Sequence, residues 1–194
     1  QQAYVSYKAP VGKGLQLDFG KFVTALGSEV IETRDNANYS RSLLFAYAIP
    51  YYHFGLRATY PVASSLTLGG QVVNGWNNVA DNNTGKTYVG TVSWSPHKRL
   101  NIIQNVITGP ERTDQNRGWR TVFDTVVSVT ATERLTVLGN YDYGRDRPDG
   151  FQRAHWTGVA GGFRYAVNNW LAIAPRLEWF NDVDGFATGV AQRV

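Results

Sequence analysis

The stretch WLAIAPRLEW, residues 170–179, alternates between two kinds of side chain. Successive side chains of a β-strand point to opposite faces, so one face of this stretch is apolar and the other carries charge. The pattern predicts a strand that separates an apolar phase from water. The two faces are Leu171, Ile173, Pro175, Leu177 and Trp179, and Ala172, Ala174, Arg176 and Glu178.

The same alternation recurs in 3–9, 52–60 and 135–143, and turn residues interrupt it at regular spacing. Most of the resulting segments are near the roughly 9–11 residues that a tilted strand needs to cross a bilayer. We predict about ten strands, with an eleventh beginning near Gly189. The ten are 2–9, 15–26, 51–61, 66–76, 87–95, 99–108, 119–131, 134–144, 155–166 and 169–180.

The connections between these strands alternate in length. Short turns at one rim and long loops at the other are typical of outer-membrane barrels, whose short turns are periplasmic. The sequence therefore predicts one all-β domain over 1–194, an antiparallel up-and-down transmembrane β-barrel, with no helix longer than about two turns. The short turns are Pro10–Gly14, Val62–Ser65, Ser95–Lys98, Thr132–Glu133 and Val167–Asn168, and the long loops are Gly27–Pro50, Asn77–Lys86, Gly109–Gly118, Arg145–Ala154 and Asn181–Thr188.

Aromatic residues gather near the predicted strand ends. In a bilayer such residues form girdles at the two interfaces. We expect this of Tyr60, Trp76, Tyr88, Trp94, Trp119, Tyr143, Trp156, Tyr165, Trp170 and Trp179.

The composition fits a wall with one apolar and one wet face. Aromatic residues make up 13% of the chain and glycine numbers 20, yet the mean hydropathy is only −0.30. No apolar run reaches 18 residues, so no transmembrane helix is expected. The formal charge of +4 is spread along the chain, which argues against a nucleic-acid partner. Cysteine and methionine are absent, and we expect that a signal peptide has been removed.

The predicted strand faces separate lipid-facing from inward residues. A charge facing lipid near the midplane would cost about 2–4 kcal/mol, so the polar set is expected to line a wet interior. The expected outer face includes Leu15, Leu17, Phe19, Phe54, Leu56, Leu135, Val137, Leu171, Ile173 and Leu177. The pore-lining candidates are Lys8, Asp18, Arg57, Gln71, Asp124, Asn140, Asp142, Arg164, Arg176 and Glu178.

The loop 27–50 is the longest. Its apolar end, Leu43–Ile49, is expected to pack, since exposed apolar patches usually mark contacts. We predict that the loop folds inward or follows the wall, with capping of the rim as the alternative. Ser28–Glu32 is the one place where a helical turn is expected. The constriction candidates are Asn36, Asn38, Tyr39 and Arg41.

Sequence motifs for catalysis or metal binding are weak. His53, His97 and His155 fall in a strand, a turn and a loop margin, so we expect no metal site. A Ser40, His53 and Asp142 triad has no spacing motif behind it. The two Asp-rich stretches 81–85 and 182–185 read as turns and lack the later Glu of an EF-hand. No enzyme, catalytic residue or cofactor is predicted.

Several segments resemble the porin-2 family of bacterial outer-membrane β-barrels. The specific ones are QAYVSYKAPVGKGLQLDFGKFVTALGSEVIET (2–33) and NYSRSLLFAYAIPYYHFGLRATYPV (38–62). VVNGWNNVADNNTGKT (72–87), YDYGRD (141–146) and RLEWFNDVDGF (176–186) are similar to later segments of the family. The resemblance implies a porin-like barrel in the bacterial outer membrane, with poorly defined substrates and no established catalytic site.

Members of that family are typically longer, and the chain lacks the terminal aromatic residue of outer-membrane barrels. We therefore expect a part of a wider barrel. The alternative is a compact ten-stranded pore, in which 2–9 pairs with 169–180.

The leading function is passive diffusion of small polar solutes through an outer-membrane barrel, with the lipid bilayer and the solutes as partners. A rival is a narrow, non-conducting barrel that serves as a structural or ligand- and partner-binding surface protein. Pore width separates the two, because small barrels have filled interiors. A third reading is a soluble β-sandwich, which would bury the Leu171 and Leu177 face against a second sheet. The solute, the ion preference and a homo-oligomeric state are left open by the sequence.

Overall fold

The computed structural model describes residues 2–147 and 153–194. Within these ranges twelve strands form one sheet, and every paired strand is antiparallel to its neighbour. The order follows the sequence from β1 to β9, then β11 and β12, and β10 pairs with β9. The strands are β1 (Ala3–Ala9), β2 (Leu15–Val23), β3 (Tyr52–Ala63), β4 (Leu66–Val73), β5 (Thr87–His97), β6 (Leu100–Arg112), β7 (Gln115–Thr130), β8 (Leu135–Asp146), β9 (Ala154–Ala166), β10 (Ala172–Ile173), β11 (Arg176–Asp182) and β12 (Gln192–Arg193).

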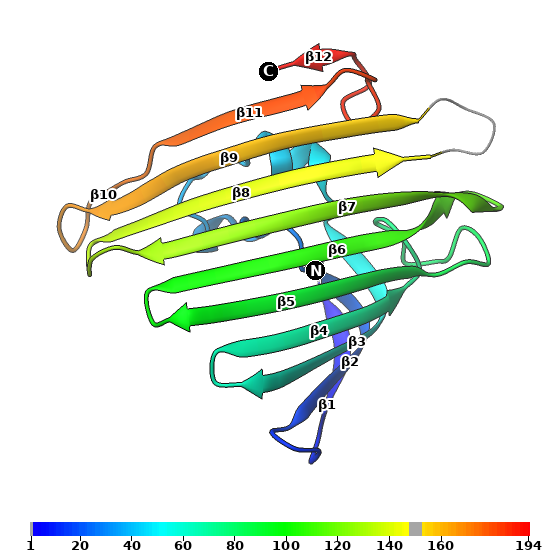
Figure 1. Ribbon diagram of the computed structural model, residues 1–194, viewed down its shortest axis with the longest axis horizontal. Helices are drawn as coiled ribbons and strands as arrows, with labels where there is room; N and C mark the ends of the chain where they lie inside the picture. The colour runs from blue at the N-terminus through cyan, green and yellow to red at the C-terminus, as the bar shows by residue number, and fades with distance from the viewer. Residues whose placement is uncertain (1, 148–152) are drawn as a thin grey trace.

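The sheet is a curved wall whose two edges are not joined. The broad strands form the front of the view, and β1–β3 turn behind them (Figure 1). In the described part of the chain, β1 pairs only with β2, and β11 pairs with β9 and β12. The compact closure through 2–9 and 169–180 is therefore not observed. The strand expected near Gly189 is present as β12.

Helical structure is confined to the segment that crosses from β2 to β3. Among the described residues it consists of η1 (Thr33–Asp35) and η2 (Leu44–Ala48), each shorter than two turns. The helical turn expected at Ser28–Glu32 was wrong: the turns form later in the segment. No helix in the described ranges has the length and apolar character needed to cross a membrane.

The strand prediction was wrong in two places. Gly109–Gly118 is not a long loop, because β6 and β7 continue to a tight turn at 113–114, where Asp114 has a φ of +59°. Strand β5 and the loop before it support this extension: Glu111 accepts hydrogen bonds from the Thr87 hydroxyl at the start of β5 and from the Trp76 backbone N–H in the loop. The segment 169–180 is split into β10 and β11 at Pro175, which has no N–H to donate to a ladder. The loop Arg145–Ala154 lies in part outside the described residues.

The outward face is apolar, as predicted. Leu177 is 83% exposed and Ile173 is 53% exposed, the inverse of what a soluble strand shows. A soluble sandwich is contradicted, because no second sheet covers this face in the described residues. The ten residues expected to face outward are all half-buried or exposed: Leu15, Leu17, Phe19, Phe54, Leu56, Leu135, Val137, Leu171, Ile173 and Leu177.

Gln104 and Thr125 form a polar pair on this apolar face. The Gln104 amide donates to the backbone oxygens of Asn105 and Asp124, at 3.0 and 2.9 Å. Its oxygen accepts from the Thr125 hydroxyl at 2.7 Å. A polar group in lipid is costly unless it is hydrogen-bonded. The pair is self-contained, so it is compatible with an apolar environment.

The aromatic prediction was wrong for Trp156, which is 1% exposed. Its ring stacks on Phe186 at 5.2 Å and meets Trp76 edge-on at 6.5 Å. It faces Gly144 across the β8–β9 pair, and a Cβ there would lie 2.0 Å from the ring. Trp156 therefore packs on the concave side and not at an interface. Exposed aromatics elsewhere on the wall include Tyr88, Trp94, Trp119, Tyr165, Trp170 and Trp179.

A buried apolar cluster lies where the β2–β3 segment packs against the wall. The segment contributes Leu26, Leu44, Ala48 and Ile49, so its apolar end is packed as predicted. Burial of this kind contributes roughly 1.5–3 kcal/mol per large side chain. The wall contributes Phe22, Val73, Val89, Ile107, Val122, Trp156, Ala160 and Phe180.

Candidate channel lining and inserted loop

The predicted lining residues lie on one face of the sheet, opposite the exposed apolar residues. Register places Asp18 beside Arg57 and Arg57 beside Gln71. It also places Asp124 beside Asp142. Alternation puts the others on the same face, since strand side chains have a period of two. The segment 24–51 packs on this face too, so we call it the inner face.

Asp18 and Arg57 form an ion pair between β2 and β3. Two guanidinium nitrogens of Arg57 donate to one Asp18 oxygen at 2.8 and 3.0 Å. Ser6 and Gln16 donate to the other oxygen. The guanidinium also lies 4.5 Å from the centre of the Phe22 ring. The Asp18 carboxylate is therefore fully occupied by the wall itself.

Asp124 sits at the centre of a buried amide network. Asn105 donates to one of its oxygens at 2.7 Å and Asn140 to the other at 2.8 Å. Both amides also hold the inserted segment: Asn105 donates to the Ala25 oxygen, and Asn140 accepts from the Ser28 N–H. Asp124 thus orients the two amides that fix the start of the segment to the wall.

Asp142 and Gln71 are buried in the same wall and are incompletely satisfied. Asp142 is 0% exposed and receives a 3.4 Å contact from Asn140, while its other oxygen has no hydrogen-bond partner. The side-chain oxygen of Gln71 also lacks one. Neither side chain is open to solute, so both positions act as wall and not as accessible lining.

Arg176 joins the far end of the wall to the inserted segment. Its guanidinium donates to Glu178 on β11 at 2.7 Å and to Glu29 on the segment at 3.1 Å. It also donates to the backbone oxygens of Ser40 and Arg41. The three charged side chains are 10–19% exposed. One guanidinium therefore bridges two carboxylates and closes the segment against β11.

The carboxylates of this group also hold the backbone of the segment. Glu178 accepts from the Leu43 N–H, and Glu29 accepts from the Ser42 N–H at 2.8 Å and from its hydroxyl. The Trp156 indole donates to the Ala48 oxygen at 3.2 Å. Together these bonds hold the segment against the inner face of the curved wall, which agrees with the prediction that the loop folds inward or follows the wall.

The four constriction candidates differ in their contacts. Asn36 bonds within the segment, to the backbone of Val30 and Glu32. Asn38 donates to the wall, at 2.6 Å from the Ala174 oxygen. Tyr39 is 90% exposed.

Arg41 donates to the backbone of Tyr39 and Ile31 and stacks on Phe45. Of the four, only Asn38 has a side-chain hydrogen bond to the wall; the other bonds shape the segment itself.

Lys8 and Arg164 are the two charged lining candidates without a partner in the described residues. Both are exposed on the inner face, near the short-turn ends of β1 and β9. Arg164 faces Thr136 across the β8–β9 pair. These are the accessible charges of the predicted set.

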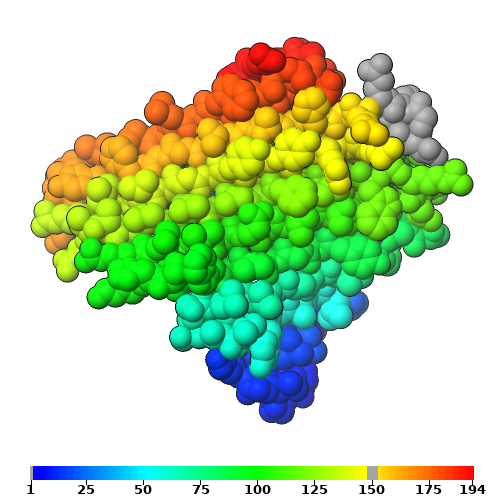
Figure 2. Space-filling model, in the orientation of Figure 1, coloured from blue at the N-terminus to red at the C-terminus, as the bar shows by residue number. Residues whose placement is uncertain are grey.

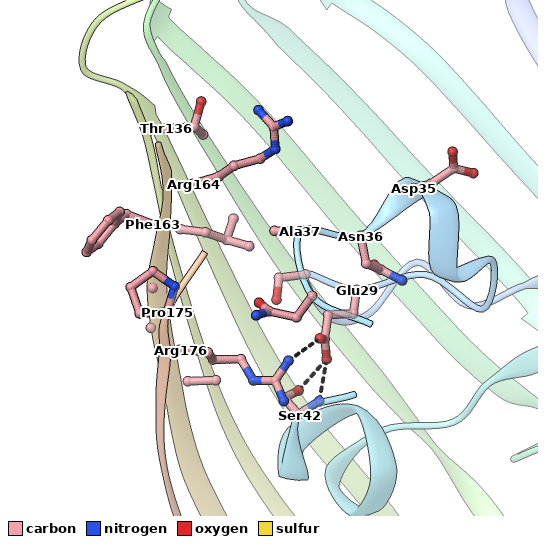
Figure 3. A pocket seen from close by; sticks show the side chains of 16 residues that line it. Glu29, Asp35, Asn36, Ala37, Ser42, Thr136, Phe163, Arg164, Pro175 and Arg176 are labelled. Carbon is pink, nitrogen blue, oxygen red and sulfur yellow. Dashed lines mark hydrogen bonds and ion pairs between the residues drawn. The ribbon is translucent and has the colours of Figure 1, made fainter. Parts of the chain in front are cut away.

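A cavity of about 270 Å³ separates the inserted segment from β8, β9 and β11. Figure 3 shows Arg164 and Thr136 on its wall side and Ala37 and Asn36 on its loop side. Arg176 and Glu29 meet at its other end, where dashed lines join them and Ser42. Charged side chains line the cavity on both sides, with Arg164 and Arg176 on the strands and Glu29 and Asp35 on the segment. Such a lining can form hydrogen bonds with a small polar solute.

The histidines do not form a common site. His53 is buried, with its ring nitrogens 3.0 Å from the Gly75 oxygen and 3.2 Å from the Thr24 hydroxyl, and so does not contact Ser40 or Asp142. His155 lies 2.8 Å from Asp184. Among the described residues no group of three or more His, Cys, Asp or Glu side chains is arranged to hold a metal.

Three residues of the inner face and of the inserted segment were not predicted. Asn105 was within reach, because its place in the alternation of 99–108 puts it on the polar face. Glu29 was not, because its ion-pair partner Arg176 lies on β11, and Ser42 was not, because it bonds to Glu29 within the folded segment. The Glu29–Arg176 pair spans 147 positions of sequence.

An apolar outer face, a polar inner face and a long loop folded inward define the wall of a porin-like β-barrel. The chain belongs to the family described as "Putative beta-barrel porin-2, OmpL-like", whose profile matches residues 1–193. No curated protein and no solved structure matches the chain.

Proposed function

We propose that this protein is a non-enzymatic channel of the bacterial outer membrane, through which small polar solutes diffuse passively. The observation that carries the proposal is the opposition of the two faces of a single sheet. The outer face exposes Leu177, Ile173 and Phe19, and the inner face carries the ion pairs Asp18–Arg57 and Arg176–Glu178. An apolar surface toward lipid and a polar surface toward water is the arrangement that bilayer-spanning barrels require.

The inserted segment supports a narrowed pathway and not an open tube. It is held by Asn105, Asn140 and Arg176, and its apolar end fills the inner face near Trp156. The remaining space includes the cavity beside Arg164. We propose that solutes pass along this side of the segment.

The proposal requires partners for the free edges of β1 and β12. In lipid each unsatisfied backbone group costs several kcal/mol. Strands added at both edges, from the same polypeptide or from another copy, would satisfy these groups and close the pore.

The rival function has an observation of its own. The buried cluster around Leu44, Ile49 and Trp156 fills the inner face near the long-loop rim, as in a narrow barrel whose interior is packed. Such a barrel would serve as a structural or ligand-binding surface protein.

Conductance separates the two functions. The protein, purified from outer membranes, is added to planar bilayers in KCl, and liposomes are tested for swelling in sugars of increasing size. We expect discrete current steps and swelling with small sugars that falls off with size. Bilayers that stay silent and liposomes that do not swell would favour the non-conducting barrel.

A further inference from the structure

Charge on the inner face is unequally available. The acids are occupied or buried: Asp18 is paired with Arg57, Glu29 and Glu178 share Arg176, and Asp124 and Asp142 are 0% exposed. The bases Lys8 and Arg164 are exposed and have no partner in the described residues. Charges of both signs lie on this face, yet among the described residues its exposed charges without an ion-pair partner, Lys8 and Arg164, are positive.

The rim at the short turns has the same sign. Its turns and adjoining strand ends, 8–16, 61–68, 95–101, 129–136 and 164–173, hold six basic residues and one acidic residue, Glu133. The basic residues are Lys8, Lys13, Lys98, Arg99, Arg134 and Arg164. Like charges gathered at one mouth raise the local concentration of oppositely charged solutes.

Arg164 joins this rim to the cavity. It lies on the cavity wall beside Thr136. The cavity lining holds two acids: Glu29, which is paired with Arg176, and Asp35, which lies 3.6 Å from Arg34. Figure 3 shows the Asp35 carboxylate on the far side of the segment, directed away from Arg164. No carboxylate of the described residues therefore forms an ion pair with the Arg164 guanidinium.

We infer that the cavity between the inserted segment and β8–β9 is an anion-accepting site, with Arg164 as its contact residue. The solutes it favours are small anions, including those that carry a carboxylate. The guanidinium presents a rigid fork of donors that matches carboxylate geometry, and the Thr136 hydroxyl lies beside it. This inference deepens the proposed channel function by naming the class of solute.

The test measures the sign of the local potential without requiring current. The chain contains no cysteine, so Thr136→Cys introduces a single reactive thiol into the cavity. In detergent, its rates of reaction with anionic sulfonatoethyl and cationic trimethylammonioethyl methanethiosulfonate are followed by mass. We expect the anionic-to-cationic rate ratio to exceed that of a free thiol.

Variants then assign the effect. Arg164→Gln should slow the anionic reagent and speed the cationic one by about two- to threefold each, and so lower the ratio about four- to ninefold, as expected for one unit charge acting through water over several ångströms. Arg164→Lys should keep it, and so should Arg145→Gln, the matched control on the outer side of β8. A ratio that Arg164→Gln leaves unchanged, in protein that retains its strand content, would overturn the inference.

The outcomes of this test and of the bilayer test are independent. A shifted ratio in a protein that passes no current would uphold the anion site and contradict the channel. If the protein passes current but Arg164→Gln leaves the rate ratio unchanged, the channel function is supported and the anion site is contradicted.

Discussion

Strand β1 and the wall of β8, β9 and β11 have the same alternating sequence pattern but different burial. In β1 six of the seven residues are exposed, on both faces. In β9 the inner positions Trp156, Gly158 and Ala160 are buried, and the outer positions are exposed or half-buried. Figure 2 shows the β1–β2 end projecting from the body of the molecule. Alternation therefore sets which face a side chain takes, and the inserted segment sets whether the inner face is covered.

The largest expected effect on the free energy of unfolding comes from removing Arg176, which holds the inserted segment against β11. Arg176→Ala leaves Glu29 and Glu178 near each other without a cation, and stranding buried charge costs about 3–5 kcal/mol. Urea unfolding of the protein in lipid vesicles should show a loss of this size. Changing Glu29, Arg176 and Glu178 together to Gln should restore much of it. A loss below about 1 kcal/mol for Arg176→Ala would mean that the segment is held by other contacts.

Alanine substitutions at two glycines of β8 should have a smaller effect on the free energy of unfolding, and one of them serves as the control for the other. Gly144 faces the Trp156 ring, where a Cβ would lie 2.0 Å from a rigid ring atom, while a Cβ on Gly139 would meet nothing within 4 Å. Gly144→Ala should cost about 1–3 kcal/mol through overpacking. Gly139→Ala should stay within about 0.5 kcal/mol. Equal midpoints in urea for the two variants would contradict the packing of Trp156 on the inner face.

The sequence predicted the sides of the wall better than its contacts. Leu177 and Glu178 are adjacent, and alternation alone assigned them to opposite faces correctly. The length of β6 and β7 was missed, because Glu111 bonds to Thr87 and Trp76 from other elements. Such partners are fixed by three-dimensional packing and leave no periodic signal.

The candidate site divides in the same way. Alternation placed Arg164 and Arg176 on the inner face. It could not predict that Arg164 has no partner in the described residues, or that Arg176 pairs with both Glu29 and Glu178. Trp156 was assigned to an interface because aromatic residues at strand ends suggest a girdle. Gly144, its partner in register, was the available signal that a large ring packs inward there.

The smallest effect is expected at β1. Lys8 is exposed and has no partner in the described residues, and within these residues no hydrogen bond joins β1 to the inserted segment. Lys8→Ala should therefore change the free energy of unfolding by no more than about 0.5 kcal/mol, measured as for Arg176. A loss comparable to that of Arg176→Ala would show that the inner side of β1 is covered after all.

Neighbouring residues of β8 test the two-faced wall most directly. Val137 is 42% exposed on the outer face, and Leu138 lines the inner cavity. Hydropathy does not distinguish them. Spin labels are attached at Val137→Cys and Leu138→Cys in protein reconstituted into bilayers, and collision with oxygen and with a water-soluble nickel complex is measured. We predict that the label at 137 meets mainly oxygen and the label at 138 mainly nickel. The same accessibility at both positions, or the reverse order, would contradict the account.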